Sequence, residues 1–116
     1  MLSKESILNI ADITTQEVVV PEWNGSVFVR SMSGAERDAF EAELVEAKKG
    51  AGTNLNNVRA KLAVRVVCDK GGTRLFTDAD AEQLGRKSAA ALDRIFTVAQ
   101  KLSGIGEKEI AELEGN

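Results

Sequence analysis

The sequence has no histidine and no tyrosine, and it contains a single cysteine, Cys68. Histidine is the commonest general base and the commonest zinc ligand, so its absence removes the usual centre of acid–base and zinc chemistry. One cysteine excludes a disulfide within the chain and fits a reducing compartment. Because Cys68 ends an apolar run that begins at Leu62, we expect it to be a small buried side chain, not a reactive thiol.

Long hydrophobic runs are also missing. No stretch approaches the ~20 apolar residues that cross a membrane, and the first ten residues lack the apolar run of a secretory signal peptide, so we expect no membrane partner. The net charge of −3 and the pI of about 5.0 argue against a general nucleic-acid-binding protein. A chain of 116 residues is long enough for one domain with its own core.

Sequence motifs for catalysis, cofactors and metals are absent. Gly71-Gly72 belongs to neither a phosphate-binding loop nor a dinucleotide-binding motif. Asp78, Asp80 and Glu82 lack the glycine and the terminal glutamate of a calcium loop, and acids at a helix N-terminus explain them better. We therefore expect no catalytic residue, no cofactor and no metal, and we predict that the chain is not an enzyme.

Residues 68–80 are the stretch that organises the chain, because they are predicted to reverse it between two long apolar segments. Gly71-Gly72 can adopt positive φ at little steric cost, which suits a tight reversal. Residues 74–76 form a short extended piece and are a candidate third strand. Thr77, followed three residues later by Asp80, predicts the start of a helix.

The clearest β signal lies in residues 16–32, where Val18 and Val20 alternate with the side chains around them. Asn24-Gly25 is typical of a tight turn between two antiparallel strands, and residues 27–30 form the predicted return strand. A two-stranded hairpin is only marginally stable alone, so it must pack on a helix or pair with a third strand.

Helical patterns fill most of the remaining sequence, over residues 4–10, 35–49, 54–68, 78–86 and 89–103. The first is short enough to need docking through Ile7, Leu8 and Ile10 for its stability. Ser33 and Glu36 form a capping box at the start of the second helix. The third is apolar on too many sides for a surface helix, and we expect it to be central.

These elements predict an α+β fold that is predominantly helical, with a small antiparallel hairpin near the N-terminus. We expect residues 1–104 to form one globular domain and residues 105–116 to be an acidic, mobile tail. The core is predicted to combine the helices of residues 55–68 and 89–103 with four further large apolar side chains: Phe40, Leu44, Leu75 and Phe76.

Two features leave alternatives open. Trp23 is either a lid on a small core or a contact for a partner, because tryptophan is enriched at interface hot spots. Arg59, Lys61 and Arg65 share the polar arc of one helix. They form either a solvated face or a nucleic-acid contact, and three basic residues without neighbouring aromatics are a weak nucleic-acid signal.

Several short motifs, taken in their order along the chain, resemble one known family. They are V-P-E-W-N-G-S-V at residues 20–27, Arg30, S-G-A-E-R at residues 33–37, G-G-T-R-L-F-T at residues 71–77 and L-S-G at residues 102–104. This series resembles the tail assembly chaperones of long-tailed, non-contractile bacteriophages and their prophages. Asn24 stands where the family pattern more often has glycine, and an Asn-Gly turn keeps the same geometry.

The resemblance implies a non-catalytic protein of the host bacterial cytoplasm. Such chaperones bind the tape measure protein, keep it soluble, help to recruit tail tube subunits and are not expected in the mature virion. A longer frameshift product and a homo-oligomer both stay open. The alternatives are another small virion or prophage component, such as a head–tail connector, and a nucleic-acid-binding regulator that uses the three basic residues of the central helix.

The predicted partner-binding residues share exposure or a break in regular structure. They are Trp23, Asn24, Gly25, Gly50, Thr53, Ile105, Ile110 and Leu113.

Overall fold

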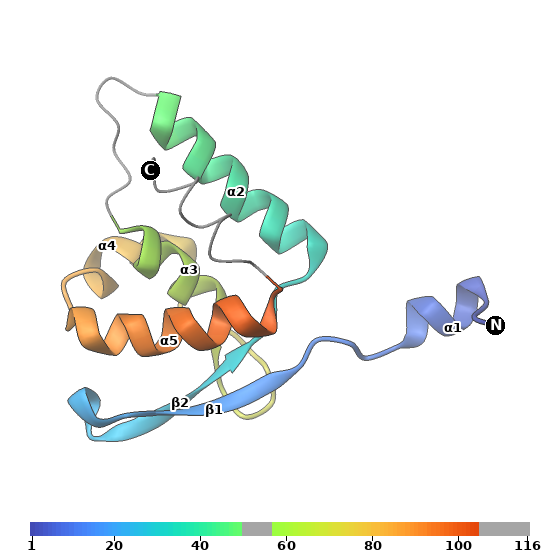
Figure 1. Cartoon of the computed structure of the whole chain (residues 1–116), viewed down its shortest axis with the longest axis horizontal. Helices are drawn as coiled ribbons and strands as arrows, with labels where there is room; N and C mark the ends of the chain where they lie inside the picture. Colours follow the sequence, from blue (N-terminus) through green and yellow to red (C-terminus); the bar gives the residue numbers. More distant parts are fainter. Residues whose placement is uncertain (50–56, 105–116) are drawn as a thin grey trace.

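The computed structural model describes residues 1–49 and 57–104. Helices surround one side of a small antiparallel sheet, and the first helix extends away from the rest (Figure 1). The elements in chain order are α1 (Lys4–Asn9), β1 (Thr15–Val20), η1 (Pro21–Trp23), β2 (Gly25–Arg30), α2 (Gly34–Lys49), α3 (Val58–Val66), β3 (Val67–Cys68), η2 (Asp78–Asp80), α4 (Ala81–Leu84) and α5 (Ala89–Leu102). The predicted α+β, predominantly helical fold is confirmed.

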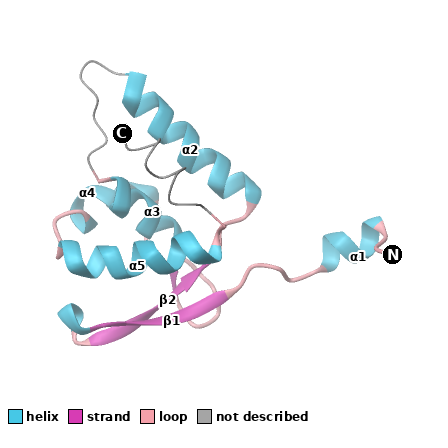
Figure 2. Cartoon of the chain, in the orientation of Figure 1, coloured by secondary structure: helices cyan, strands magenta, loops and turns pink. Residues whose placement is uncertain are grey.

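The sheet has the order β1-β2-β3, and both strand pairs are antiparallel. Figure 2 shows the long hairpin of β1 and β2 below the helices. Val20 pairs with Gly25 at the tip of the hairpin, and the register continues to Thr15 at the other end. Val18 and Val20 are buried, whereas Val19 between them is 67% exposed. The alternation predicted from the valines therefore holds, with one face of β1 toward the helices and the other toward solvent.

The connection between β1 and β2 is residues 21–24, which is longer than the two-residue Asn-Gly turn that the sequence predicts. Pro21–Trp23 forms a single turn of 3₁₀ helix, and the N–H of Asn24 donates to Pro21 O at 3.0 Å. Asn24 takes the left-handed conformation with φ 55°, which asparagine tolerates better than most residues. Gly25 already belongs to β2.

Residues 74–76 were the candidate third strand. In the structure the third strand is instead β3, which follows α3 directly. Cys68 pairs with Phe28 of β2, and Arg74 makes only a single bridge to Cys68. Periodicity missed this change because the apolar residues before Cys68 suit a buried strand as well as a buried helix. Leu75 is 55% exposed, which corrects its predicted place in the core.

The core lies between α3, α5 and the inner face of the sheet. Phe40 and Leu44 from α2 are fully buried there, as predicted, and Phe76 packs against it while partly buried. Burial of one large apolar side chain stabilises a fold by roughly 1.5–3 kcal/mol. Side chains that are fully buried in this core include Phe40, Leu44, Val29, Leu62, Val64 and Ile95.

The C-terminal end of α3 is closed by arginine side chains. The last carbonyls of any α-helix lack partners within the helix, and here the chain turns from Val66 straight into buried β3. Arg74 Nε donates to Val64 O at 2.9 Å, and Arg30 Nε donates to Arg65 O at 3.3 Å. The guanidinium of Arg65 donates to Lys61 O at 3.1 Å, a carbonyl farther inside the helix.

The arginines that close α3 also hold the neighbouring helices. Arg30 forms an ion pair with Glu36, whose carboxylate accepts from the N–H of Ser33 at 3.0 Å in the predicted capping box. Arg74 donates to Asp78 of η2 at 2.8 Å. One set of contacts therefore fixes α2, η2 and the sheet relative to α3.

The reversal after β3 is built around Asp69 and Gly72. Asp69 Oδ1 accepts from the N–H groups of Gly71 and Thr73, at 2.8 and 3.0 Å. Gly72 has φ +90°, a conformation that side chains other than glycine rarely adopt. Gly71 does not have a positive φ, so the backbone conformation requires glycine only at position 72.

Gly72→Ala is expected to lower the free energy of unfolding by about 1–2 kcal/mol, because alanine is strained at positive φ. Gly71→Ala is the matched control, since a Cβ there would lie 3.4 Å from Asp69 Oδ1, an ordinary contact. Urea unfolding followed by circular dichroism measures both. Equal losses for the two variants would contradict the assigned role of Gly72.

Arg30→Gln is expected to lower the free energy of unfolding by about 2 kcal/mol, because it removes charged hydrogen bonds to a helix end and to a cap. The side chain of Arg30 is only 15% exposed. Arg86→Gln is the control: its ion pair with Glu82 is exposed, and its loss should change stability by less than about 0.5 kcal/mol. Thermal unfolding distinguishes the two, and similar small losses would refute the structural role of Arg30.

Candidate partner-binding surface

A cavity of about 640 Å³ lies between the tip of the hairpin and α4. Its residues come from three separate parts of the chain: Trp23, Phe76, Asp80, Gln83, Leu84 and Lys87. Trp23, Phe76 and Leu84 make it apolar, while the other three side chains supply polar groups. An apolar hollow with polar groups around it is the common form of a recognition site.

The 3₁₀ turn η1 positions Trp23 at this cavity. Pro21 opens the turn and fixes its first φ angle, and the left-handed Asn24 returns the chain to β2. Trp23 is half-buried and packs against the core while it lines the cavity. Both roles considered for Trp23, the lid and the exposed contact, are therefore compatible with its position.

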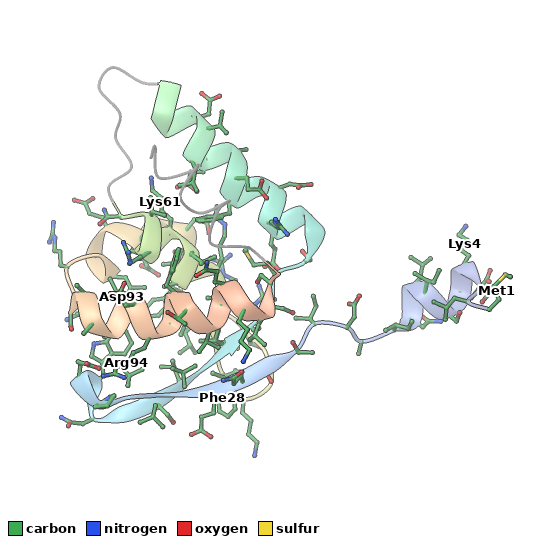
Figure 3. All side chains as sticks on the ribbon, in the orientation of Figure 1. Met1, Lys4, Phe28, Lys61, Asp93 and Arg94 are labelled. Carbon is green, nitrogen blue, oxygen red and sulfur yellow. The ribbon has the colours of Figure 1, made fainter. Side chains whose placement is uncertain are left out.

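A bidentate ion pair ties η1 to α5. Arg94 Nε lies 2.9 Å from Glu22 Oε1, and its terminal nitrogen lies 3.1 Å from Oε2. Figure 3 shows Arg94 between α5 and the hairpin tip. The hydrogen bond from Arg94 holds the pKa of the Glu22 carboxyl below its usual value, and the same contact raises the pKa of Arg94.

The opposite wall is positioned by the start of η2. Thr77 N donates to Asp80 Oδ2 at 2.8 Å as part of a capping box, at the helix start that the sequence predicts. This cap places Phe76 immediately before the turn and Leu84 at the end of α4, so that both side chains reach the cavity from one side. Asp80 therefore serves the cap as well as lining the cavity.

A second, shallower groove of about 430 Å³ runs between β1 and α5. Val18, Val19 and Val98 give it an apolar surface, and Arg94 lies at it together with Asp93 and Thr97. Since Arg94 also holds the hairpin tip, this groove and the Trp23 cavity flank the same ion pair.

The predicted partner-binding residues fall into two groups. Asn24 and Gly25 lie next to Trp23 at the tip, but neither lines the cavity. The other predicted residues lie outside the described residues: Gly50, Thr53, Ile105, Ile110 and Leu113. Sequence analysis did not identify Gln83, Leu84 and Lys87, because nothing in the local pattern of α4 indicates that it meets a hairpin tip.

The three basic residues of α3 differ in exposure: Arg59 is exposed, Lys61 is partly buried and Arg65 is buried. Arg65 is buried, pairs with Glu43 at 2.8 Å and lies over the ring of Phe40. Arg59 pairs with Asp93, and Lys61 lies 3.9 Å from Glu43. Because carboxylates accompany all three charges, the arrangement disfavours phosphate binding at this helix.

Three further features of the described residues bear on function: possible metal ligands, the thiol of Cys68 and the length of the helices. Within residues 1–49 and 57–104, no three histidine, cysteine, aspartate or glutamate side chains group as they would around a metal ion. Burial raises the pKa of the Cys68 thiol, as its predicted core position implies. None of the helices described is both long enough and apolar enough to span a membrane.

The fold defines a small α+β protein with an apolar cavity at its hairpin tip. A sequence profile described as phage tail assembly chaperone matches residues 4–115. The chain therefore belongs to the phage tail assembly chaperone family. A similar solved structure is that of the bacteriophage HK97 tail assembly chaperone, with 26% sequence identity, a TM-score of 0.62, and coverage of 85% of this chain and 89% of that one. No curated protein matches the chain in sequence.

The motifs that carried the resemblance have structural roles in this chain. Arg30 and Arg74 close α3, and Ser33 begins α2 through its capping box. Ser103 Oγ accepts from the N–H of Met32 at 3.2 Å, joining the end of α5 to the start of α2. Only the motif around Trp23 and the residue Phe76 also contribute to the cavity.

Arg94→Gln is expected to raise the pKa of Glu22 toward its ordinary value, because the mutation removes the main cause of the shift. A carboxyl with a lowered pKa in the folded state stabilises the fold above its unfolded pKa, and that contribution disappears as the pH falls through its folded pKa. The stability difference between wild type and Arg94→Gln should therefore be present at neutral pH and vanish in acid. Carboxyl NMR titration and unfolding at several pH values measure these effects, and in a Glu22→Gln background Arg94→Gln should lose its pH dependence.

Proposed function

We propose that this tail assembly chaperone binds the tape measure protein of its phage and keeps that protein soluble before the tail tube assembles around it. Membership of the family supports an assembly role. The observation that carries the binding surface is the apolar cavity between Trp23 and α4, which is open to apolar side chains of another chain. A rigid aromatic beside such a hollow is a common anchor at protein interfaces.

A protein with this role must bind apolar segments of the tape measure protein and release them later. A tape measure protein is a long, helical and partly apolar chain, and an amphipathic helix is recognised by inserting a few side chains into an apolar groove. The Trp23 cavity is held by the ion pair between Glu22 and Arg94 and by the core below it. It is therefore formed before the partner arrives, which reduces the entropy lost on binding.

The proposal extends to assembly. The chaperone would help to bring tail tube subunits to the covered tape measure protein, act in the host cytoplasm and leave before the virion is complete. Pull-down of tube protein by the chaperone in the presence of a tape measure fragment tests recruitment. Protein analysis of purified virions tests departure, because a structural component such as a head–tail connector would be found in them.

Co-expression with a tape measure fragment is the direct test of the binding role. The soluble fraction of the fragment should increase several-fold when this chain is present, and the two should co-purify. Equal solubility of the fragment with and without the chain would refute the proposed function.

Trp23→Ala should weaken co-purification of the fragment by about tenfold or more, because it removes the larger of the two aromatic side chains that line the cavity. Trp23→Phe should retain most of the binding. Leu75→Ala is the matched control, since Leu75 is an exposed apolar side chain outside the cavity. Gln83→Glu places a charge in the cavity from an exposed position, so it tests the site even if Trp23→Ala lowers stability. Unchanged binding by Trp23→Ala and Gln83→Glu would place the binding surface elsewhere.

A further inference from the structure

Two charged side chains, Asp80 and Lys87, are among the residues that line the Trp23 cavity. The carboxylate of Asp80 already has partners within the chain. Its Oδ2 accepts from the N–H of Thr77 at 2.8 Å and from the hydroxyl of Thr77 at 3.3 Å. The negative charge at this cavity is therefore engaged in the cap of η2.

The ammonium group of Lys87 has no such partner. Within residues 1–49 and 57–104, it takes part in no ion pair and no hydrogen bond, and its side chain is exposed. The charges on the neighbouring elements are paired with each other: Glu22 with Arg94, and Glu82 with Arg86. Lys87 is therefore the charge that this part of the described chain presents to a bound partner.

The backbone that carries Lys87 is held in place at the end of α4. The N–H of Lys87 donates to Leu84 O at 3.0 Å, and the N–H of Gly85 donates to Ala81 O at 2.9 Å. A Cβ on Gly85 would collide with Asn57 Oδ1 at the start of α3, so this turn packs closely on its neighbour. Leu84 in the same turn is buried and lines the cavity. The apolar wall and the base of the lysine side chain therefore belong to one fixed turn.

We propose that the segment bound in the Trp23 cavity is a helix with two recognition residues. It places a large apolar side chain in the cavity and, one helical turn away, an aspartate or glutamate against Lys87. Side chains three or four positions apart on a helix lie about 5–6 Å from each other, so one helix can supply both. The inference rests on the proposed function, in which this cavity binds another chain, and it adds the chemistry of that partner.

Charge complementarity carries the choice of an acidic residue. A carboxylate beside an unpaired ammonium gains most where apolar side chains and the bound helix exclude water. A basic residue at the same place would meet Lys87 with like charge, which disfavours such a partner. Asp80 offers a basic residue less, because its carboxylate already accepts two hydrogen bonds from Thr77. Lys87 is therefore a specificity-determining residue, while the apolar lining supplies the fit.

Lys87→Glu should weaken binding of the tape measure fragment by about tenfold or more, because it replaces an attraction by a repulsion. Lys70→Glu is the matched control: Lys70 is exposed, it does not line the cavity, and its substitution changes the net charge equally. That variant should remain within about twofold of wild type. Isothermal titration calorimetry measures both. Equal effects of the two variants on a fragment that binds would overturn the inference and leave the proposed function standing.

An exchange of charges identifies the acidic residue of the partner. Each aspartate and glutamate of the bound fragment is replaced by lysine in turn. One replacement should weaken binding to wild type by about tenfold and regain most of that loss with Lys87→Glu, as expected for two groups in direct contact. A fragment in which Lys87→Glu rescues no position would contradict the proposed pair.

Two synthetic helical peptides test the inference without the tape measure protein. They contain no tryptophan and differ only in a glutamate or a lysine placed four residues after a phenylalanine. Emission from Trp23, the only tryptophan of the chain, measures their binding to the full chain. Wild type should bind the glutamate peptide about tenfold more tightly than the lysine peptide, and Lys87→Glu should reverse that preference.

Absence of binding by both peptides, or a preference that Lys87→Glu leaves unchanged, would overturn the inference. If the peptides show the expected preference but the tape measure fragment does not bind, the proposed function fails and the inference stands. The peptide and fragment measurements therefore distinguish the failure of one from the failure of the other.

Discussion

The fold depends on the closure of one helix end inside the protein. Helix α3 stops at Val66 and the chain enters β3 at the next residue, with both segments buried. A buried carbonyl without a partner costs about 1–3 kcal/mol, and the helix end presents several. Arg74 and Arg30 supply donors to Val64 O and Arg65 O at this end, while the guanidinium of Arg65 donates to Lys61 O farther inside the helix. The transition from central helix to sheet therefore depends on contacts from β2 before it and from the reversal after it.

The same arginines also form ion pairs with the elements around α3. Their second partners are Glu36, Glu43 and Asp78, so α2 and η2 are held by charges that would otherwise be exposed. Most of the short motifs that carried the resemblance are used in this internal framework. Three features of the described residues lie outside this framework: the Trp23 cavity at one end of the sheet, the edge of β1 that does not face β2, and the N-terminal arm, residues 1–13, at the other end.

Local rules predicted the elements whose causes are local. The capping box at Ser33, the helix start at Thr77 and the helix over residues 89–103 all follow from residues a few positions apart. The end of α3 did not, because an apolar run satisfies a helix and a strand equally well. Leu75 was expected in the core from its hydrophobicity alone, and the single backbone bridge at Arg74 instead leaves it exposed. Arg65 was expected on a polar arc, and Glu43 of α2 and Asp78 of η2 allow it to be buried.

The sequence by itself determined the fold class, the reversal at Gly72 and the absence of histidine-based chemistry, because each depends on residue type or on short-range spacing. It also carried enough short motifs, in order, to indicate the family. Tertiary structure alone decided which arginines close α3, which three segments surround the Trp23 cavity and which strand keeps an open edge. These features join residues that are far apart in the chain, and no local pattern of hydrophobicity or charge records which distant partner a side chain will meet.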